Sequence, residues 1–272
     1  MTTRALTPSN ARARAWLFGA ALAGAAAIVL PGLARVGASH GFGGPPPPPN
    51  LAACRVADEP AQHERYDQWA ETLLDTAHSL GPDYVPPDLI AAEIAGRSVR
   101  LRAFVVPELR ALIDRAAADG VTISVASGYR SYRRQAQMVR QLIQAEGEAS
   151  ALLWAARPGH SEHQLGTTVD LAGGADWLSE NAWRSGFVMS YPPGRSPGLT
   201  CYRPEVWHYR YFGRERAAAI RGSGLSPREW LWQRHQPAGS GEKFGPRLTS
   251  AGVWPIRRRA SPRPCPSGSR CR

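Results

Sequence analysis

The sequence predicts an α+β domain in which a small antiparallel sheet is flanked by helices. Two observations lead to this fold class. Short β-prone segments recur in the second half of the chain, and segments with apolar residues at helical spacing precede and interrupt them. The expected strands are residues 122–126, 167–171, 187–191 and 206–212.

The expected helices are defined by apolar periodicity and by residues that begin or end a helix. Glycines follow the first two, and Ser226-Pro227-Arg228-Glu229 is a capping box for the last. The four helices are 66–80, ended by Gly81; 107–118, ended by Gly120; 131–146; and 226–233.

The two ends of the chain differ in composition from this central part. Residues 1–40 contain an uncharged, Ala/Leu-rich run at 15–34 behind a basic flank, which is typical of a secretory signal peptide or of an uncleaved membrane anchor. Both alternatives predict that the rest of the chain is exported. We then expect a Pro/Gly-rich linker, one folded domain and a disordered basic tail, at 41–57, 58–235 and 236–272.

The net charge of +11 suggests a nucleic-acid partner, but its distribution argues against one. Residues 55–235 contain 21 Arg and Lys and 21 Asp and Glu, so the folded part is neutral. The first 54 residues contribute +4 and the tail contributes +7. There is also no phosphate-binding glycine loop and no basic helix with interleaved aromatics. We therefore expect no nucleic-acid partner.

Two short stretches, 161–170 and 204–209, carry the residues with catalytic potential. Two imidazoles, one carboxylate ligand and one spare carboxylate are the groups of a catalytic zinc site with an open fourth position and a general base. Those groups belong to His163, Asp170, His208 and Glu205.

The spacing of Glu205 and His208 constrains the local structure. Residues three apart on a regular strand point to opposite faces, so both side chains reach one metal only if Glu205 lies on the loop before the strand or at a bulge. Pro204 and the β-prone residues after it argue against a helical zinc motif. The alternative is a buried His208 that is bonded to Glu205 among packed aromatic side chains.

With these motifs in order, the chain resembles the VanY-type D-alanyl-D-alanine carboxypeptidases and their LAS-type zinc peptidase relatives. The resemblance covers about residues 62–213 and implies a single zinc peptidase domain of the LAS or hedgehog-like type. The matching residues are Ser127-Gly128-Tyr129-Arg130-Ser131 with Gln135, Ser161-x-His163-x6-Asp170, and Glu205-x-x-His208.

The resemblance implies a role for each matching residue. One zinc ion would be held by His163, Asp170 and His208, and Glu205 would be the general base. Arg130 would stabilise the oxyanion, for which a permanently charged planar guanidinium is suited. Arg130, Gln135 and Ser161 would contact the substrate. From the residues alone, Gln135 would be a solvated helix residue and Ser161 a turn former.

The implied function is that of an exported zinc-dependent carboxypeptidase that hydrolyses the C-terminal D-alanine from peptidoglycan stem peptides. The bond would be D-Ala-D-Ala or an L,D bond, and the sequence leaves this choice open. A peptidoglycan endopeptidase and a non-catalytic, zinc-braced wall-binding protein are the alternatives, and Glu205 argues against the second because a structural site needs no base. We expect a monomer, attached to the membrane through its N-terminal segment if that segment stays uncleaved.

The four cysteines do not have the spacing of a metal motif. In an exported protein, Cys54 would pair with Cys201 and Cys265 with Cys271, which is one of three possible connectivities. His160 is expected to be a polar loop residue and not a fourth ligand. Thr167 and Thr168 depart from the family pattern, in which a small or apolar residue is commoner before Val-Asp.

Overall fold

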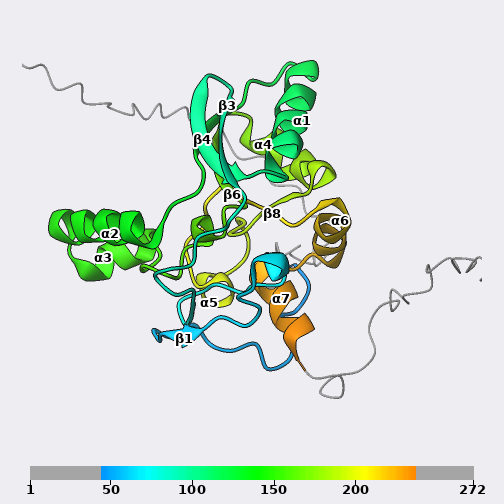
Figure 1. Ribbon diagram of the computed structural model, residues 1–272. Coiled ribbons are helices and arrows are strands. Elements are labelled where there is room, and N and C mark those ends of the chain that lie inside the picture. The colour runs from blue at the N-terminus through cyan, green and yellow to red at the C-terminus, as the bar shows by residue number, and fades with distance from the viewer. Residues whose placement is uncertain (1–43, 237–272) are drawn as a thin grey trace, which may run out of the picture. The chain divides into compact units, whose positions relative to one another are not determined.

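The structure is a computed structural model that describes residues 44–236 of the 272-residue chain (Figure 1). The predicted N-terminal signal or anchor, the basic tail beyond residue 236 and the Cys265–Cys271 pair lie outside the described residues. Within 44–236, no helix has both the length and the hydropathy to cross a bilayer.

The described chain contains both strands and helices. The strands are β1 (Glu59–Pro60), β2 (His78–Ser79), β3 (Leu89–Ile94), β4 (Arg97–Arg102), β5 (Ser124–Ser127), β6 (Thr168–Ala172), β7 (Phe187–Met189) and β8 (His208–Tyr211). The α-helices are α1 (Val105–Ala118), α2 (Tyr132–Glu146), α3 (Glu148–Trp154), α4 (Ala175–Asn181), α5 (Pro197–Thr200), α6 (Arg214–Ser223) and α7 (Pro227–His235). Three 3₁₀ helices are η1 (Tyr66–Gln68), η2 (Glu162–Leu165) and η3 (Ala182–Ser185).

The central feature is a four-stranded antiparallel sheet with the order β5-β6-β8-β7. Its register places Ser127 opposite Asp170, and Asp170 opposite His208. Directly opposed residues share one face of a sheet, so these three side chains form a row across β5, β6 and β8. The predicted α+β class, with a small antiparallel sheet and flanking helices, is confirmed.

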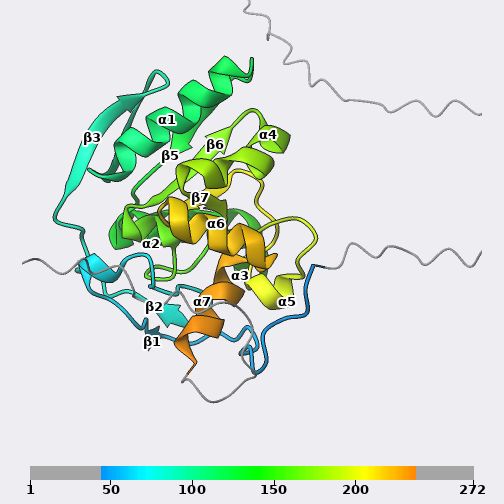
Figure 2. The same cartoon turned by 90° about the vertical axis from the view of Figure 1, so that its right-hand side faces the viewer.

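The opposite face of the sheet forms the main hydrophobic core. Because side chains alternate along a strand, Val169 and Leu171 point away from Asp170, and Tyr209 points away from His208. These residues form one hydrophobic cluster with the buried side chains of α1, which include Leu109 and Leu112. Figure 2 shows α1 lying along the hairpin β3–β4 and beside β5 and β6. The core therefore fixes the sheet and leaves its other face for the polar row.

Several predicted elements agree with the structure. The helix predicted at 107–118 is α1, which starts two residues earlier, and the helix predicted at 131–146 is α2, with the Ser131 side chain accepting the Arg134 amide as its N-cap. The capping box at Ser226 begins α7. The four predicted strands correspond to β5 through β8, each within a few residues.

The helix predicted at 66–80 is wrong, because only η1 is helical there. Polar side chains offer this segment's backbone other partners. Thr72 donates its hydroxyl to the carbonyl of His63, and Asp75 Oδ1 accepts the amides of Ala77 and His78. The apolar positions are nevertheless buried, in two smaller clusters, so the periodicity identified core residues without a helix: Leu73, Leu74 and Leu80.

The hairpin β3–β4 and the helices α3, α4, α5 and α6 were not predicted from the sequence. In Figure 1 the antiparallel pair α2–α3 stands beside the sheet, and α3 follows α2 after the single residue Gly147. Gly147 has φ +82°, a conformation that suits glycine and turns the chain back. The α2–α3 pair forms one wall of the cavity described below.

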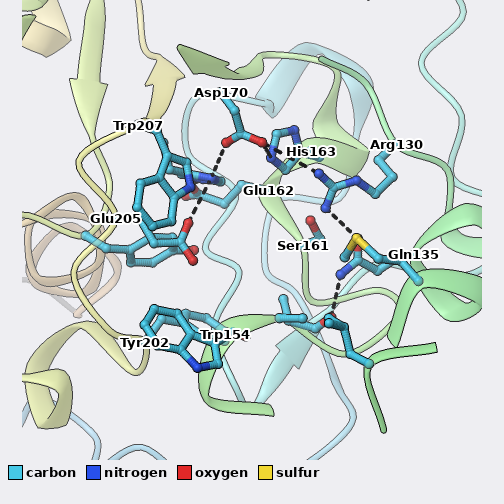
Figure 3. Close-up of a pocket in the computed structure, with 16 residues that line it drawn as sticks. Arg130, Gln135, Trp154, Ser161, Glu162, His163, Asp170, Tyr202, Glu205 and Trp207 are labelled. Carbon is cyan, nitrogen blue, oxygen red and sulfur yellow. Dashed lines mark hydrogen bonds and ion pairs between the residues drawn. The ribbon is translucent and has the colours of Figure 1, made fainter. Parts of the chain in front are cut away.

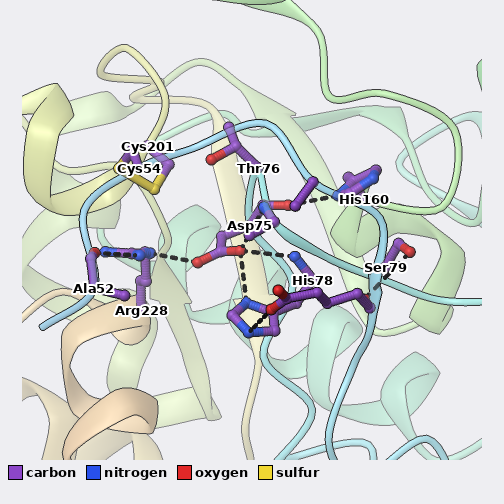
Figure 4. Close-up of polar contacts among 12 residues, drawn as sticks. Ala52, Cys54, Asp75, Thr76, His78, Ser79, His160, Cys201 and Arg228 are labelled. Atoms are coloured by element: carbon purple, nitrogen blue, oxygen red, sulfur yellow. Dashed lines mark hydrogen bonds and ion pairs between the residues drawn. A yellow bond between two sulfur atoms is a disulfide. The ribbon is translucent and has the colours of Figure 1, made fainter.

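Several contacts fix the segment before β1 to the domain, and Figure 4 shows two of them, the disulfide of Cys54 and the bond from Arg228 to Ala52. A disulfide joins Cys54 to Cys201, with Cα atoms 5.3 Å apart, which confirms that part of the predicted pairing. Arg228 donates to the carbonyl of Ala52 at 2.9 Å, and Arg195 donates to the carbonyl of Pro45 at 2.9 Å. The segment is therefore held against the loop that leads to Glu205.

Candidate metal centre and active site

The three side chains predicted to bind a metal meet on the polar face of the sheet. His163 lies in η2, while Asp170 and His208 are opposed on β6 and β8. One potential ligand atom from each residue lies within 4.8 Å of the other two (Figure 3). Residues that are up to 45 positions apart in the sequence thus form one cluster because two antiparallel strands and the turn before them bring them together.

Hydrogen bonds orient both imidazole rings. Nδ1 of His163 is 2.7 Å from the carbonyl oxygen of Gly128, so this nitrogen carries the proton and Nε2 faces Asp170 at 3.3 Å. Nε2 of His208 is 3.1 Å from Oε2 of Glu162, and its Nδ1 faces Asp170 Oδ1 at 3.3 Å. Each ring therefore presents one nitrogen to the centre of the cluster while the other is held from behind.

The cluster fits a zinc ion by its chemistry. Asp170 Oδ1 is buried and accepts no hydrogen bond from any described residue, which is costly for a carboxylate oxygen unless a cation binds it. Two imidazole nitrogens and one carboxylate oxygen are a donor set that zinc accepts while keeping a position open. His163, Asp170 and His208 are the residues that would hold the ion.

The electrostatic environment favours the metal-binding forms of two ligands. Burial lowers the pKa of His163 and keeps its ring neutral. Burial opposes ionisation of Asp170, but the neighbouring His163 and His208 outweigh it and hold the pKa of that carboxyl well below its usual range. A neutral imidazole and an ionised carboxylate are the forms that coordinate a metal.

Glu205 lies on the loop before β8, and not on the strand. β8 begins at His208, whose backbone amide donates a hydrogen bond to the carbonyl oxygen of Glu205 at 3.2 Å. Glu205 Oε2 is consequently 3.5 Å from Nδ1 of His208, and burial raises the pKa of its carboxyl. Of the two arrangements that the sequence left open, a loop position before the strand and a bulge, the structure has the loop position.

Arg130 and Gln135 form a hydrogen-bonded pair beside the ligands. Arg130 follows β5, and its Nη2 is 3.7 Å from Asp170 Oδ2. Gln135, on the first turn of α2, accepts from Arg130 Nη1 at 2.9 Å and donates to the carbonyl of Ala156 at 2.6 Å. Gln135 is only 1% exposed, so the interpretation of it as a solvated helix residue is wrong. Its amide holds the guanidinium in place.

Ser161 and His160 have different surroundings although they are adjacent. Ser161 lines the cavity, and its hydroxyl makes no hydrogen bond to the described residues. His160 is buried outside the group of three predicted metal ligands. Its Nδ1 is 2.7 Å from the carbonyl oxygen of Asp75, and its Nε2 is 3.0 Å from Asp58. Both ring nitrogens of His160 are thus engaged away from the ligands, in agreement with the prediction that it is not one of them.

Two residues of the site escaped the sequence analysis. Ser127 donates to Asp170 Oδ2 at 2.5 Å and accepts from Arg130 at 3.4 Å, so it links a ligand to the guanidinium. Glu162 is buried and contacts His208, Ser190 and Arg210. Both lie inside motifs that were recognised, but their position next to a matched residue says nothing about which way the side chain points.

A cavity of about 240 Å³ opens beside the ligands (Figure 3). The lining contains the polar side chains Arg130, Gln135, Ser161 and Glu205 and the apolar or aromatic side chains Met138, Leu142, Trp154, Tyr191, Tyr202 and Trp207. In Figure 3, Glu205 and Trp207 lie on one side, and Arg130, Gln135 and Ser161 lie on the other. A cavity lined by charged, polar and aromatic side chains beside His163, Asp170 and His208 suits a small peptide end.

Two imidazoles and a carboxylate, with a further carboxylate and an arginine beside them, are the groups of a catalytic zinc site in a hydrolase. The model of the VanY family of D-alanyl-D-alanine carboxypeptidases matches residues 98–214, which include all the residues of the cluster. The chain belongs to this family.

Individual relatives agree with this assignment. A D-alanyl-D-alanine carboxypeptidase of Enterococcus faecalis is 35% identical over 182 residues, which are 60% of this chain and 66% of that protein. This chain thus spans just under two thirds of the length of that curated relative. The structure is similar to a mutant of the vancomycin resistance D,D-pentapeptidase VanY in complex with Zn(II), with a TM-score of 0.54, 34% identity and coverage of 60% of this chain and 99% of that chain.

The LdcB LD-carboxypeptidase is also similar, with a TM-score of 0.54, 28% identity and coverage of 60% of this chain and 87% of that chain. Relatives described as a D,D-pentapeptidase and as an LD-carboxypeptidase therefore share this fold.

Proposed function

We propose that this protein is an exported, zinc-dependent carboxypeptidase that removes the C-terminal D-alanine from peptidoglycan stem peptides. The observation that carries the proposal is the cluster of His163, Asp170 and His208, in which Asp170 Oδ1 faces an oriented imidazole at 3.3 Å without a hydrogen bond and Glu205 lies beside it. The D-Ala-D-Ala substrates named for the VanY relatives support the substrate class. Export is supported only by the apolar N-terminal run and by the disulfide between Cys54 and Cys201.

Each residue of the site would have a separate role in the reaction. One bound zinc ion would supply a water of lowered pKa and would polarise the scissile carbonyl. Glu205 would take the proton of the attacking water and transfer it to the leaving amine, a role for which its raised pKa is suitable. Arg130, held by Gln135 and Ser127, would stabilise the negative charge that forms on the carbonyl oxygen.

Replacing Glu205 by Gln tests the proposed base. We expect Glu205→Gln to retain zinc and to lose turnover by at least about 100-fold, because the amide cannot accept the proton. Zinc would be measured by elemental analysis, and loss of a terminal alanine from muropeptides by mass spectrometry. Glu215→Gln, an exposed residue in the first turn of α6, is the matched control and should behave as wild type. A fully active Glu205→Gln variant would remove Glu205 as the base.

The same assay decides between the D,D and L,D bonds. Muropeptides that end in D-Ala-D-Ala and muropeptides that end in L-Lys- or diaminopimelate-D-Ala would be offered separately. Removal of alanine from only one of them assigns the specificity. Cleavage inside the stem would support an endopeptidase instead, and zinc binding without any cleavage would support a wall-binding protein.

A further inference from the structure

The open end of the cavity contains aromatic residues that the proposed reaction does not use. Trp154, the last residue of α3, and Trp207, on the turn before β8, both line the cavity, yet they are 45% and 41% exposed. His163 and His208 are 3% and 5% exposed. The two tryptophans therefore mark the end of the cavity that faces solvent, and the histidines mark the enclosed end.

An arginine lies against one of these tryptophans. The guanidinium carbon of Arg203 is 4.7 Å from the centre of the Trp154 ring. Arg203 is exposed and forms no ion pair or hydrogen bond with any side chain between residues 44 and 236. An arginine that stacks on an aromatic face keeps the N–H groups at its edge available, and these match a carboxylate in a bidentate way.

Arg203 lies close in sequence to the proposed base, on the side where the upstream part of the substrate would leave the cavity. A carboxypeptidase holds the C-terminal residue at the enclosed end, so the residues before the scissile bond must leave through the open end. Arg203 precedes Glu205 by two residues, and its Cα therefore lies within about 7 Å of that of the proposed base. One or two residues of an extended peptide span this distance. The upstream part of a bound peptide thus passes Trp154 and Arg203.

We propose that Trp154 and Arg203 form an upstream subsite that binds a free carboxylate of the substrate, one or two residues before the scissile bond. This inference rests on the proposed function and names a group of the substrate, a free carboxylate, that the enzyme would recognise. When a stem peptide is cut at the D-Ala-D-Ala bond, the residue two before the scissile bond is diaminopimelate, which carries such a carboxylate. When it is cut at the L,D bond, diaminopimelate and γ-linked D-glutamate are the residues one and two before that bond. The tryptophan ring covers the aliphatic part of such a residue, and the guanidinium pairs with its charge.

The test compares two pentapeptides on the full-length zinc-loaded protein. One is L-Ala-γ-D-Glu-diaminopimelate-D-Ala-D-Ala with its upstream carboxylates free, and the other has those carboxylates converted to amides. We expect the free acid to have a KM about fivefold lower than the diamide, the size of an exposed ion pair. Arg203→Gln should raise the KM of the free acid to that of the diamide and leave kcat unchanged.

Arg184→Gln is the matched control, because Arg184 also stacks on a tryptophan, Trp183 at 4.5 Å, which does not line this cavity. It should keep the preference for the free acid. Equal KM values for the two peptides in wild type, or an unchanged preference in Arg203→Gln, would overturn the subsite.

Calorimetric titration measures peptide binding without turnover, so it distinguishes a failure of the proposed subsite from a failure of the proposed function. Both peptides would be titrated into Glu205→Gln, with and without Arg203→Gln. Arg203-dependent binding of a peptide that the wild type never cleaves would reject the proposed function and keep the subsite. Cleavage without any effect of Arg203 would reject the subsite alone.

Discussion

At the scale of single residues, the buried Glu162 is the neighbour that decides how His208 is presented. Its carboxylate contacts His208 Nε2 at 3.1 Å, Ser190 at 2.5 Å and Arg210 at 2.9 Å. Burial opposes its ionisation, but the charge of Arg210 and the contacts with His208 and Ser190 together outweigh burial and lower the pKa of Glu162 to about 2. The ionised carboxylate holds the Nε2–H and so leaves Nδ1 to face Asp170.

We predict that Glu162→Gln weakens zinc binding by about 10- to 100-fold, the usual effect of removing a residue that supports a metal ligand. The neutral amide loses the charge that holds the His208 proton. The zinc dissociation constant would be measured by competition with a chelator. Glu180→Gln, an exposed residue on α4, serves as the control. An unchanged zinc affinity in Glu162→Gln would show that His208 is oriented by its packing alone.

At the scale of elements, the site depends on how loops are fixed to the sheet. Gly166, with φ +73°, ends η2 and directs the chain from His163 into β6. A Cβ there would lie 2.8 Å from the side chain of Leu89, so the hairpin β3–β4 packs directly over this turn. On the other side of the site, the loop that leads to Glu205 is fixed by the disulfide of Cys201.

We predict that removing the disulfide with Cys54→Ser and Cys201→Ser destabilises the protein by up to about 5 kcal/mol. The bridge closes a loop of 147 residues, and the unfolded chain gains the entropy of that loop when the bridge is absent. The free energy of unfolding would be measured in urea with and without reductant. Wild type under reducing conditions should match the double variant, whose stability should not respond to reductant. Equal stability of oxidised and reduced wild type would contradict the entropic role.

At the scale of the whole molecule, Asp75 connects segments from both ends of the described chain (Figure 4). Its Oδ2 accepts from Arg228 of α7 at 2.7 Å, and its Oδ1 is 2.8 Å from His78 Nδ1. Arg228 also binds the carbonyls of Ala52 and Leu199. Burial opposes ionisation of Asp75, but His78 and Arg228 prevail and hold the pKa of this carboxyl well below its ordinary value.

The lowered pKa of Asp75 predicts an acid-dependent loss of stability. Because the folded state binds the proton of Asp75 more weakly than the unfolded state, its contribution is complete above the unfolded pKa of about 3.9 and is lost as the pH falls through the lower folded pKa. We expect a decrease on the order of a few kcal/mol below about pH 4. Urea unfolding between pH 2 and 7 would measure it.

The variant Asp75→Asn should be less stable at neutral pH by roughly 3 kcal/mol, because Arg228 then remains buried without its counter-charge. Its stability should also fall less steeply in acid. Asp114→Asn, at an exposed position of α1, is the control and should retain the wild-type pH dependence. If Asp75→Asn and wild type lose stability in parallel below pH 4, the acid sensitivity arises from other carboxyl groups.

Elements with a strong local signal could be predicted from the sequence. Ser131 and Ser226 begin helices because their side chains accept backbone amides within three residues, which depends on neighbouring residues only. The helix expected at 66–80 was wrong because the same apolar spacing also buries an irregular segment when Thr72 and Asp75 offer the backbone other partners. The hairpin β3–β4 is stabilised by packing onto α1, which no local pattern encodes.

The available chemistry and the fold class could be predicted from the order of residues along the chain: two imidazoles, an aspartate, a glutamate and an arginine in three ordered motifs. That these groups meet depends on tertiary contacts, because the pairing of Asp170 with His208 is a matter of strand register between distant segments. Tertiary contacts also decide which ring nitrogen faces the centre, through Gly128 and Glu162. The residue type of a ligand can be read from the sequence, because it is a local property. The orientation of its side chain cannot, because buried hydrogen-bond partners from other parts of the chain fix it.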